Sequence, residues 1–222
     1  MKRREALRRV AVVAATLGAG VPILAAGRSL HIGCTLDRSS VEMANGTGLH
    51  LGASAFFNAV NKLGGIGGAR VELSVSDDQF KPDLAKANAQ AFGADRSILA
   101  LLHPLGTRQT AAVMDAVQDM AIVGPNTGTV GLRKKGAANV FWVRANYDQE
   151  VEKLVSTAST LGITHIGLVH PNDPLGQSLL AAFNAATAKA GLKPAVIATT
   201  PNTTSMDVQP AVLAIAKAAP QV

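Results

Sequence analysis

The sequence predicts an α/β protein in which helices cover both faces of doubly wound parallel sheets. Apolar residues recur at helical spacing in several segments, and short runs rich in Val, Ile and Leu separate those segments. Because helices and strands alternate along the chain, consecutive strands are expected to run parallel, joined by crossover helices. At 222 residues, of which 48% are hydrophobic and 16% charged, the chain can bury one large core or two modest ones.

The helix predicted over residues 49–63 is amphipathic. Its apolar side chains recur three or four residues apart, so one face can pack on a sheet while the polar face meets water. The apolar positions are Leu49, Ala53, Phe56, Val60 and Leu63, and the polar positions are Asn58, Asn61 and Lys62. Gly64 and Gly65 then end the helix, because glycine readily takes the left-handed backbone of a helix C-cap.

A strand follows the paired glycines. Residues 71–76 alternate apolar and polar side chains, which is typical of a strand buried on one face. Neighbouring residues on a strand point to opposite faces, so we interpret Asp77 and Asp78 as a solvated strand end rather than a catalytic carboxylate pair. Pro82 and Asp83 suit the first turn of the next helix.

The rest of the chain repeats this rhythm. A first strand is predicted over residues 30–36, followed by a loop over residues 37–48. Further strands are predicted over residues 98–102, 120–123, 141–144, 165–170 and 195–200. Further helices are predicted over residues 83–95, 107–118, 147–161, 174–190 and 206–218. Residues 98–102 are continuously apolar, so we expect this strand to be covered on both faces.

The positive charge is concentrated at the N-terminus. Six basic residues against Glu5 give +5 in the first 28 residues, which leaves 6 − 5 = +1 for the remainder. No basic helix follows, so we expect no nucleic-acid partner. A basic start, an apolar run over residues 10–24 and small residues at 25–27 predict a cleaved signal peptide over residues 1–27. Sec export, twin-arginine export and a retained anchor remain open.

The residues that usually carry chemistry form no recognisable constellation. Cys34 is the only cysteine, and its place in an alternating strand favours a buried thiol over a lipidated or catalytic one. The five histidines lack metal-ligand spacing, and nucleophile-elbow, phosphate-loop and zinc-peptidase motifs are absent from the sequence. Residues 64–68 follow a helix and precede a strand, the reverse of a dinucleotide fingerprint. We therefore predict no catalytic residue, no metal site and no cofactor.

Loops at the carboxyl ends of the predicted strands are the expected place for a ligand. These loops cover residues 37–48, 77–81, 103–106, 124–129 and 171–176. Gly106 and Thr107 open a helix whose backbone N–H groups can hold a carboxylate, although ordinary helix capping would use the same residues. Asn126 and Thr127 offer neutral donors and acceptors beside Gly128, which permits close backbone approach.

Three segments together carry a family resemblance. The first is the apolar helix that ends in residues 61–68, with the strand and Asp77-Asp78 that follow it. The second is Arg144 followed by Asp148-Gln149, and the third is residues 166–170 with Gly176. Over residues 30–217 the chain resembles the branched-chain amino-acid-binding group of periplasmic solute-binding proteins of ABC transporters. The resemblance implies a two-lobed type I periplasmic binding protein, with a first lobe over residues 28–146 and an incomplete second lobe over residues 147–222.

The resemblance also implies which residues hold the ligand. In that family, loops after the third and fourth strands bind carboxylate and ammonium groups. Those loops match Leu105-Gly106-Thr107 and Asn126-Thr127-Gly128. Leu105 stands where a serine is frequent, Leu175 where an aromatic commonly faces the ligand, and Asn45 near a tyrosine of some members. These departures weigh against a leucine-type ligand, and the alternatives are a different amino acid, an amide or a carboxylate.

The implied function is transport without chemistry. The protein would bind a small molecule in the periplasm and present it to an ABC transporter permease in the inner membrane, closing about a hinge near residues 144–147. Members of that family usually exceed 300 residues, so a chain of this length is expected to be poorly stable alone. Two alternatives remain open, a ligand-sensing extracytoplasmic module of a receptor and a truncated fragment without function.

Overall fold

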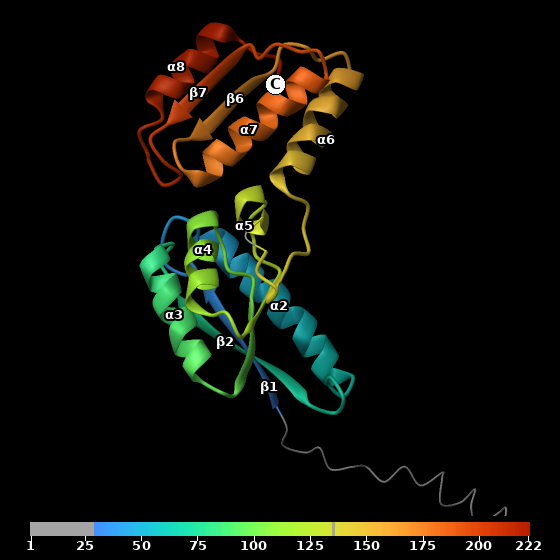
Figure 1. Cartoon of the computed structure of the whole chain (residues 1–222), viewed down its shortest axis with the longest axis vertical. Coiled ribbons are helices and arrows are strands. Elements are labelled where there is room, and N and C mark those ends of the chain that lie inside the picture. The colour runs from blue at the N-terminus through green and yellow to red at the C-terminus, as the bar shows by residue number, and fades with distance from the viewer. Residues whose placement is uncertain (1–28, 135) are drawn as a thin grey trace, which may run out of the picture.

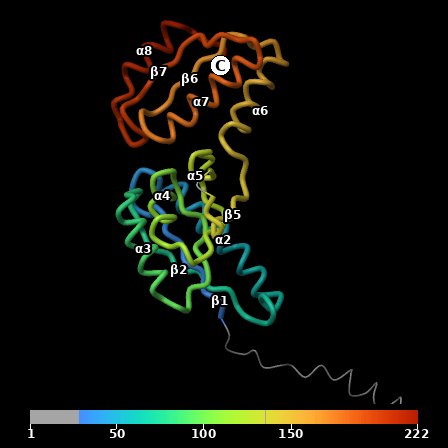
Figure 2. The backbone as a smooth tube through the Cα atoms, viewed as in Figure 1, coloured from blue at the N-terminus to red at the C-terminus, as the bar shows by residue number. Residues whose placement is uncertain are grey.

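The computed structural model describes residues 29–134 and 136–222, and the signal peptide predicted over residues 1–27 lies outside them. The described chain forms two α/β bodies, which we call the first and second lobes (Figures 1 and 2). The first is built on a five-stranded sheet of order β2-β1-β3-β4-β5, and the second on the pair β6-β7. All strand pairs within these sheets are parallel, which confirms the predicted α/β class.

The first lobe follows the predicted order of elements. Its strands are β1 (Ser29–Leu36), β2 (Arg70–Asp77), β3 (Ile98–Leu102), β4 (Ala121–Val123) and β5 (Val140–Phe141). Its helices are α2 (Met43–Lys62), α3 (Pro82–Ala94), α4 (Thr107–Ala116) and α5 (Val130–Lys134). Helices α3 and α4 cover one face of the sheet, where Leu101, Val113 and Ile122 form the core, and α2 lies on the other face (Figure 1).

Helix α2 begins earlier than predicted, so residues 43–48 are helical and not part of a loop. The carboxylate of Asp37 accepts the backbone N–H groups of Ser39, Ser40 and Glu42, at 3.1, 2.7 and 2.7 Å, and closes the turn within a few residues. A Cβ at Gly46 would lie 1.9 Å from the carbonyl oxygen of Asp37, so this position requires glycine. Such glycines made the first turns of α2 resemble a loop in the sequence.

The buried face of α2 also differs from the prediction. Phe56 and Leu63 are 65% and 89% exposed, whereas Phe57 lies partly buried in an apolar groove on the sheet. Asn61 does not face water, because its side chain hydrogen-bonds the backbone of Val71. The half-buried positions of α2 include 49, 53, 57, 60 and 61, and this mixed three- and four-residue spacing leaves Phe56 on the outer side.

Several boundaries and burial predictions are confirmed or corrected elsewhere in the lobe. Gly64 and Gly65 have φ of 101° and 76° and end α2 as expected, and α3 begins at Pro82. Leu99 of β3 is exposed beside an apolar groove that the described helices leave open, so this strand is not covered on both faces. The short helix α5 was not predicted.

The second lobe contains two strands and three helices among the described residues. They are α6 (Tyr147–Thr160), β6 (Gly167–Pro171), α7 (Pro174–Lys189), β7 (Val196–Thr200) and α8 (Gln209–Ala218). Val155 of α6, Ile166 before β6 and Phe183 of α7 form its core. Helix α8 starts at Gln209, later than predicted, because Pro210 takes the first turn, where it needs no N–H acceptor. No helix within residues 29–134 or 136–222 is both long and apolar enough to cross a membrane.

Candidate functional site

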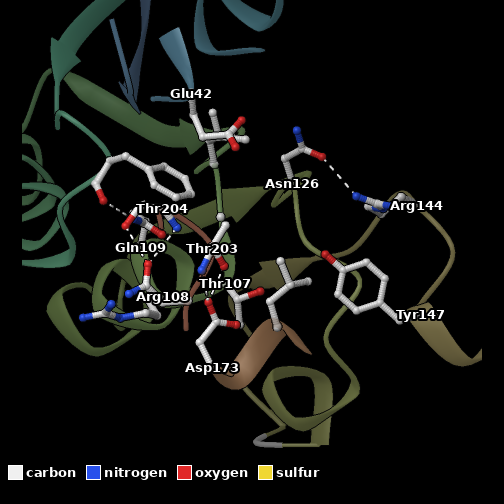
Figure 3. A pocket seen from close by; sticks show the side chains of 15 residues that line it. Glu42, Thr107, Arg108, Gln109, Asn126, Arg144, Tyr147, Asp173, Thr203 and Thr204 are labelled. Atoms are coloured by element: carbon white, nitrogen blue, oxygen red, sulfur yellow. Dashed lines mark hydrogen bonds between the residues drawn. The ribbon is translucent and has the colours of Figure 1, made fainter. Parts of the chain in front are cut away.

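A cavity of about 230 Å³ lies between the two lobes (Figure 3). Loops that follow β1 to β4 supply the first-lobe wall, and loops that follow β6 and β7 supply the second-lobe wall. All of these loops lie at the carboxyl ends of parallel strands, where ligands bind in such sheets. The volume is below the range of roughly 300–1,000 Å³ of pockets for drug-sized molecules, so the cavity suits a smaller solute.

The N-terminus of α4 forms part of the first-lobe wall. Gly106 is the N-cap residue, with φ 96°, and makes no side-chain cap. The N–H groups of Thr107, Arg108 and Gln109 therefore have no carbonyl partner within the helix, and the helix dipole makes this end attractive to anions. A Cβ at Gly106 would lie 2.5 Å from Gln109 Oε1, so only glycine keeps this wall open.

Three buried hydroxyl groups join the loop after β3 to the loop after β4. Thr107 Oγ1 lies 2.8 Å from Thr127 Oγ1 and 3.0 Å from Thr129 Oγ1. Thr127 is fully buried and does not line the cavity. Its neighbour Gly128 lies beneath Tyr147, whose ring would be 2.5 Å from a Cβ at that glycine. Thr127 and Gly128 therefore shape the wall from behind.

Asn126 and Arg144 connect this wall to the chain segment that links the two lobes. Arg144 Nη1 donates to Asn126 Oδ1 at 3.1 Å, a contact visible in Figure 3. Nε and Nη2 of Arg144 donate to Glu150 Oε1 of α6 at 3.1 and 2.5 Å, so Glu150 balances the guanidinium charge. The guanidinium also lies 5.6 Å from the centroid of the Tyr147 ring.

Asp173 dominates the second-lobe wall. Its carboxylate caps α7 by accepting the N–H of Gly176 at 3.1 Å, and it also accepts the N–H of Thr203 at 2.9 Å and the Thr203 hydroxyl. Burial alone would raise the pKa of Asp173, but these hydrogen bonds outweigh burial and lower it. The cavity therefore has an ionised carboxylate facing the N-terminus of α4 across the gap, with Leu175 beside it.

The structure brings together five of the eight residues predicted as ligand-binding. Leu105, Gly106, Thr107, Asn126 and Leu175 line the cavity, whereas Thr127 and Gly128 lie behind its wall. Asn45 lies outside the cavity. Because α2 begins at Met43, Asn45 is on the first turn of that helix, where it donates to Glu42 Oε2 at 2.5 Å and borders a separate shallow hollow beside His103.

Other residues of the cavity wall were not predicted. They are Glu42, Phe80, Arg108, Gln109, Arg144, Tyr147, Asp173, Asn202, Thr203 and Thr204. Phe80 and Asp173 belong to loops that the sequence places at the carboxyl ends of strands, so that rule could have found them. Residues 202–204 were missed partly because the last helix was expected to begin at residue 206 and leave only a short loop.

Two features bear on chemistry at other positions. Cys34 is 2% exposed within β1, as predicted, and burial raises the pKa of its thiol to about 12, which makes it a poor nucleophile. Asp78 is 1% exposed, so the expectation of a solvated strand end is wrong for this residue. The Thr35 hydroxyl donates to Asp78 at 2.9 Å and provides the polar partner that lets the carboxyl turn inward. Among the described residues, no group of three His, Cys, Asp or Glu could hold a metal ion.

Comparisons with known proteins agree on one family. The periplasmic binding protein family matches residues 29–222. The protein "Leu/Ile/Val-binding protein homolog 3" of Brucella melitensis is 26% identical over 171 residues, which are 76% of this chain and 46% of that protein.

Two solved structures are similar in fold and sequence. A substrate-binding periplasmic protein from Ralstonia solanacearum has 27% identity and a TM-score of 0.75, with 84% of this chain and 53% of that chain covered. An extracellular ligand-binding receptor from Verminephrobacter eiseniae has 26% identity and a TM-score of 0.71, with 86% and 53% covered. The chain thus spans about half the length of these relatives.

Proposed function

Because this chain belongs to the periplasmic binding protein family, we propose that it forms part of the extracytoplasmic solute-binding component of an ABC transporter. Its ligand is an amino acid or a related small carboxylate or amide, which it delivers to the permease for import. Residues 28–146 act as the first lobe and residues 147–222 as part of the second. A capping box at Asn146, whose side chain pairs with the N–H of Gln149, supports a lobe boundary at the start of α6.

The observation that carries this proposal is the pair of opposed polar groups in the cavity. The first lobe presents the N-terminus of α4, where three N–H groups can donate hydrogen bonds to a carboxylate. The second lobe presents Asp173, whose ionised carboxylate can accept hydrogen bonds from an ammonium or amide group. A zwitterion, or a small molecule with a carboxylate and an amide, can span these two walls. Its carboxylate then accepts hydrogen bonds from the α4 N–H groups, and its ammonium or amide group donates to Asp173. The name of the Brucella relative is consistent with such a ligand.

Binding proceeds by closure and needs no chemical step. A ligand that contacts both walls stabilises the conformation in which they approach, and so shifts the population toward the closed form. Residues 144–147 act as the hinge for this closure, because the chain crosses from the first lobe to the second there. Arg144 hydrogen-bonds Asn126 of the first lobe and Glu150 of the second. The buried thiol of Cys34 and the absence of catalytic motifs in the sequence support a role without catalysis.

Calorimetric titration of the purified chain with L-leucine, L-glutamate, L-glutamine and benzoate tests the proposal. We expect at least one probe to bind, and the Gly106→Ala variant to lose affinity by at least roughly tenfold, because a Cβ there is strained and closes the N-terminus of α4. Gly52→Ala is the matched control, since a Cβ at that helical position meets nothing within 4 Å. No binding by any probe, or equal binding by Gly106→Ala, would contradict the proposal.

A further inference from the structure

The segment after β2 holds two consecutive residues in a backbone conformation that side chains rarely adopt. Gln79 has φ 51° and Phe80 has φ 55°, both in the left-handed region, and neither is glycine. Phe80 lines the cavity between the lobes. Such backbone persists only where surrounding contacts over-determine it. The groups that hold this turn therefore help to shape the cavity.

Two carboxylates and one amide hold the turn. Asp77 Oδ1 accepts the N–H of Gln79 and Asp78 Oδ1 accepts the N–H of Phe80, each at 2.9 Å. From the first turn of α4, the side-chain amide of Gln109 donates to the carbonyl of Phe80. The Phe80 ring lies against the same helix end, because a Cβ at Gly106 would be 2.8 Å from it. The position of Phe80 is thus tied to the N-terminus of α4.

Asp78 is the buried carboxylate of this set. Its Oδ2 accepts the Thr35 hydroxyl at 2.9 Å, and Asn88 of α3 donates to that hydroxyl at 3.2 Å. The charged groups that face Asp78 are Asp37 after β1 and Asp77 of β2, both acidic. Among the described residues no base pairs with it, because Arg38 Nη1 lies 2.6 Å from His50 Nδ1 and Lys81 Nζ lies 2.9 Å from Gln79 Oε1.

These surroundings raise the pKa of Asp78, so that its carboxyl gains a proton in mildly acidic solution. The pKa of Asp78 is raised to about 6, chiefly by burial; the hydrogen bonds from Thr35 and the Phe80 N–H lower it, and the charges of Asp37 and Asp77 raise it. An ionised acceptor forms a hydrogen bond roughly twice as strong as a neutral one. Loss of the charge therefore weakens the contact that keeps Phe80 in strained backbone.

We propose that Asp78 is a positioning residue of the cavity, whose carboxylate holds Phe80 in the left-handed turn against α4 and releases that turn when it is protonated. The consequence for binding rests on the proposed function, since Phe80 belongs to the wall that the ligand would contact. Acid then weakens ligand binding through the shape of the first-lobe wall. The position of Phe80 itself can be measured with no ligand present.

Fluorine NMR of the whole chain labelled with 4-fluorophenylalanine tests the placement of Phe80. The chain has six phenylalanines, and Phe80→Leu identifies the resonance of Phe80. In the parent chain this resonance should move between about pH 8 and pH 5 with a midpoint near 6. In Asp78→Asn it should stay near its acid position throughout. Asp95→Asn is the control, because Asp95 also caps a turn, at Ser97, but lies outside the cavity.

A second variant keeps the test decisive if Asp78→Asn fails to fold. The Thr35 hydrogen bond lowers the pKa of Asp78, so Thr35→Val should move the midpoint of the Phe80 resonance to higher pH. A Phe80 resonance that stays fixed between pH 8 and pH 5, or that titrates equally in the parent and in Asp78→Asn, would overturn the proposal.

Calorimetry with whichever of L-leucine, L-glutamate, L-glutamine and benzoate binds separates this inference from the proposed function. The parent chain should lose roughly 3- to 10-fold in affinity between about pH 7.5 and 5.5, and Asp78→Asn less than about twofold. Equal affinity at both pH values in the parent would overturn the link to binding. If leucine and the other probes fail to bind while the Phe80 resonance titrates as expected, the proposed function is contradicted and the positioning role of Asp78 is supported.

Discussion

The side chain of Asn61 in α2 pairs with both backbone groups of Val71 in β2, donating to its C=O and accepting from its N–H, each at 2.8 Å. Val71 is the second residue of its strand and is buried. The amide thus satisfies two backbone groups at the point where the chain turns from helix to strand. It fixes the glycine-rich turn, whereas the sequence pattern predicted that the Asn61 side chain would face water.

Replacement of Asn61 by alanine is expected to destabilise the first lobe. Both backbone groups of Val71 would lose their partner, so the free energy of unfolding should fall by about 1–3 kcal/mol. Urea unfolding followed by the fluorescence of Trp142 measures the change. Asn58→Ala, on an exposed position of the same helix, should stay within about 0.5 kcal/mol of the parent. Equal effects of the two variants would contradict the role given to Asn61.

The guanidinium of Arg144 should not be replaceable by an ammonium. Lysine keeps the charge but cannot donate to both Asn126 and Glu150 in the observed fork. Because the pair with Glu150 is partly exposed, we expect Arg144→Lys to cost only about 1 kcal/mol of unfolding free energy. Arg96→Lys at an exposed position is the control. Unchanged stability in Arg144→Lys, measured by urea unfolding, would show that the fork is unimportant.

The buried carboxyl of Asp78 should lower stability at neutral pH. Its pKa rises from 3.8 to about 6 on folding, so between these values the folded chain binds more protons than the unfolded one. Stability therefore falls as pH rises from about 4 to 6, by about 3 kcal/mol if the whole shift is realised. Asp78→Asn should regain about 1–3 kcal/mol at pH 8 and little at pH 4. Urea unfolding at both pH values checks this, and a variant less stable than the parent at pH 8 would refute it.

Asp173 should contribute stability of the opposite pH dependence. Hydrogen bonds lower its pKa below 3.8, so its contribution is present above that pH and is lost as the pH falls through the lower folded value. Asp173→Ala should cost about 1 kcal/mol at pH 7, since α7 loses its cap. Asp207→Ala, at an exposed position in the same lobe, is the control. Thermal unfolding at pH 7 should lower the midpoint only for Asp173→Ala.

Local patterns were sufficient to predict most of the fold. Alternation in residues 71–76 and the paired glycines at 64 and 65 fix elements through interactions only a few residues apart, and the structure has these elements where expected. The start of α2 was missed because Gly46 lies against the Asp37 carbonyl, a contact with the segment that precedes the helix. Burial of Asp78 was missed for the same reason, since Thr35 on the neighbouring strand makes it possible.

Only five of the fifteen residues that line the candidate site were predicted, for a similar physical reason. Gly106 and Thr107 have the residue types of a helix start, so the sequence alone could indicate them as candidates. Asp173 and Thr203 become part of the same wall only when the second lobe folds, because one caps α7 and the other reaches that cap from the loop after β7. Neither the sequence around Asp173 nor the sequence around Thr203 predicts the contact between these two residues.

The central claim is that the α4 N-terminus and the Asp173 wall hold one small solute between them. The most direct test is amide chemical-shift mapping of the ¹⁵N-labelled chain titrated with L-leucine, L-glutamate, L-glutamine and benzoate. We predict that a binding probe shifts the amides of Thr107, Arg108 and Gln109 together with those of Thr203 and Thr204. Shifts confined to other parts of the chain, or none with any probe, would contradict the claim.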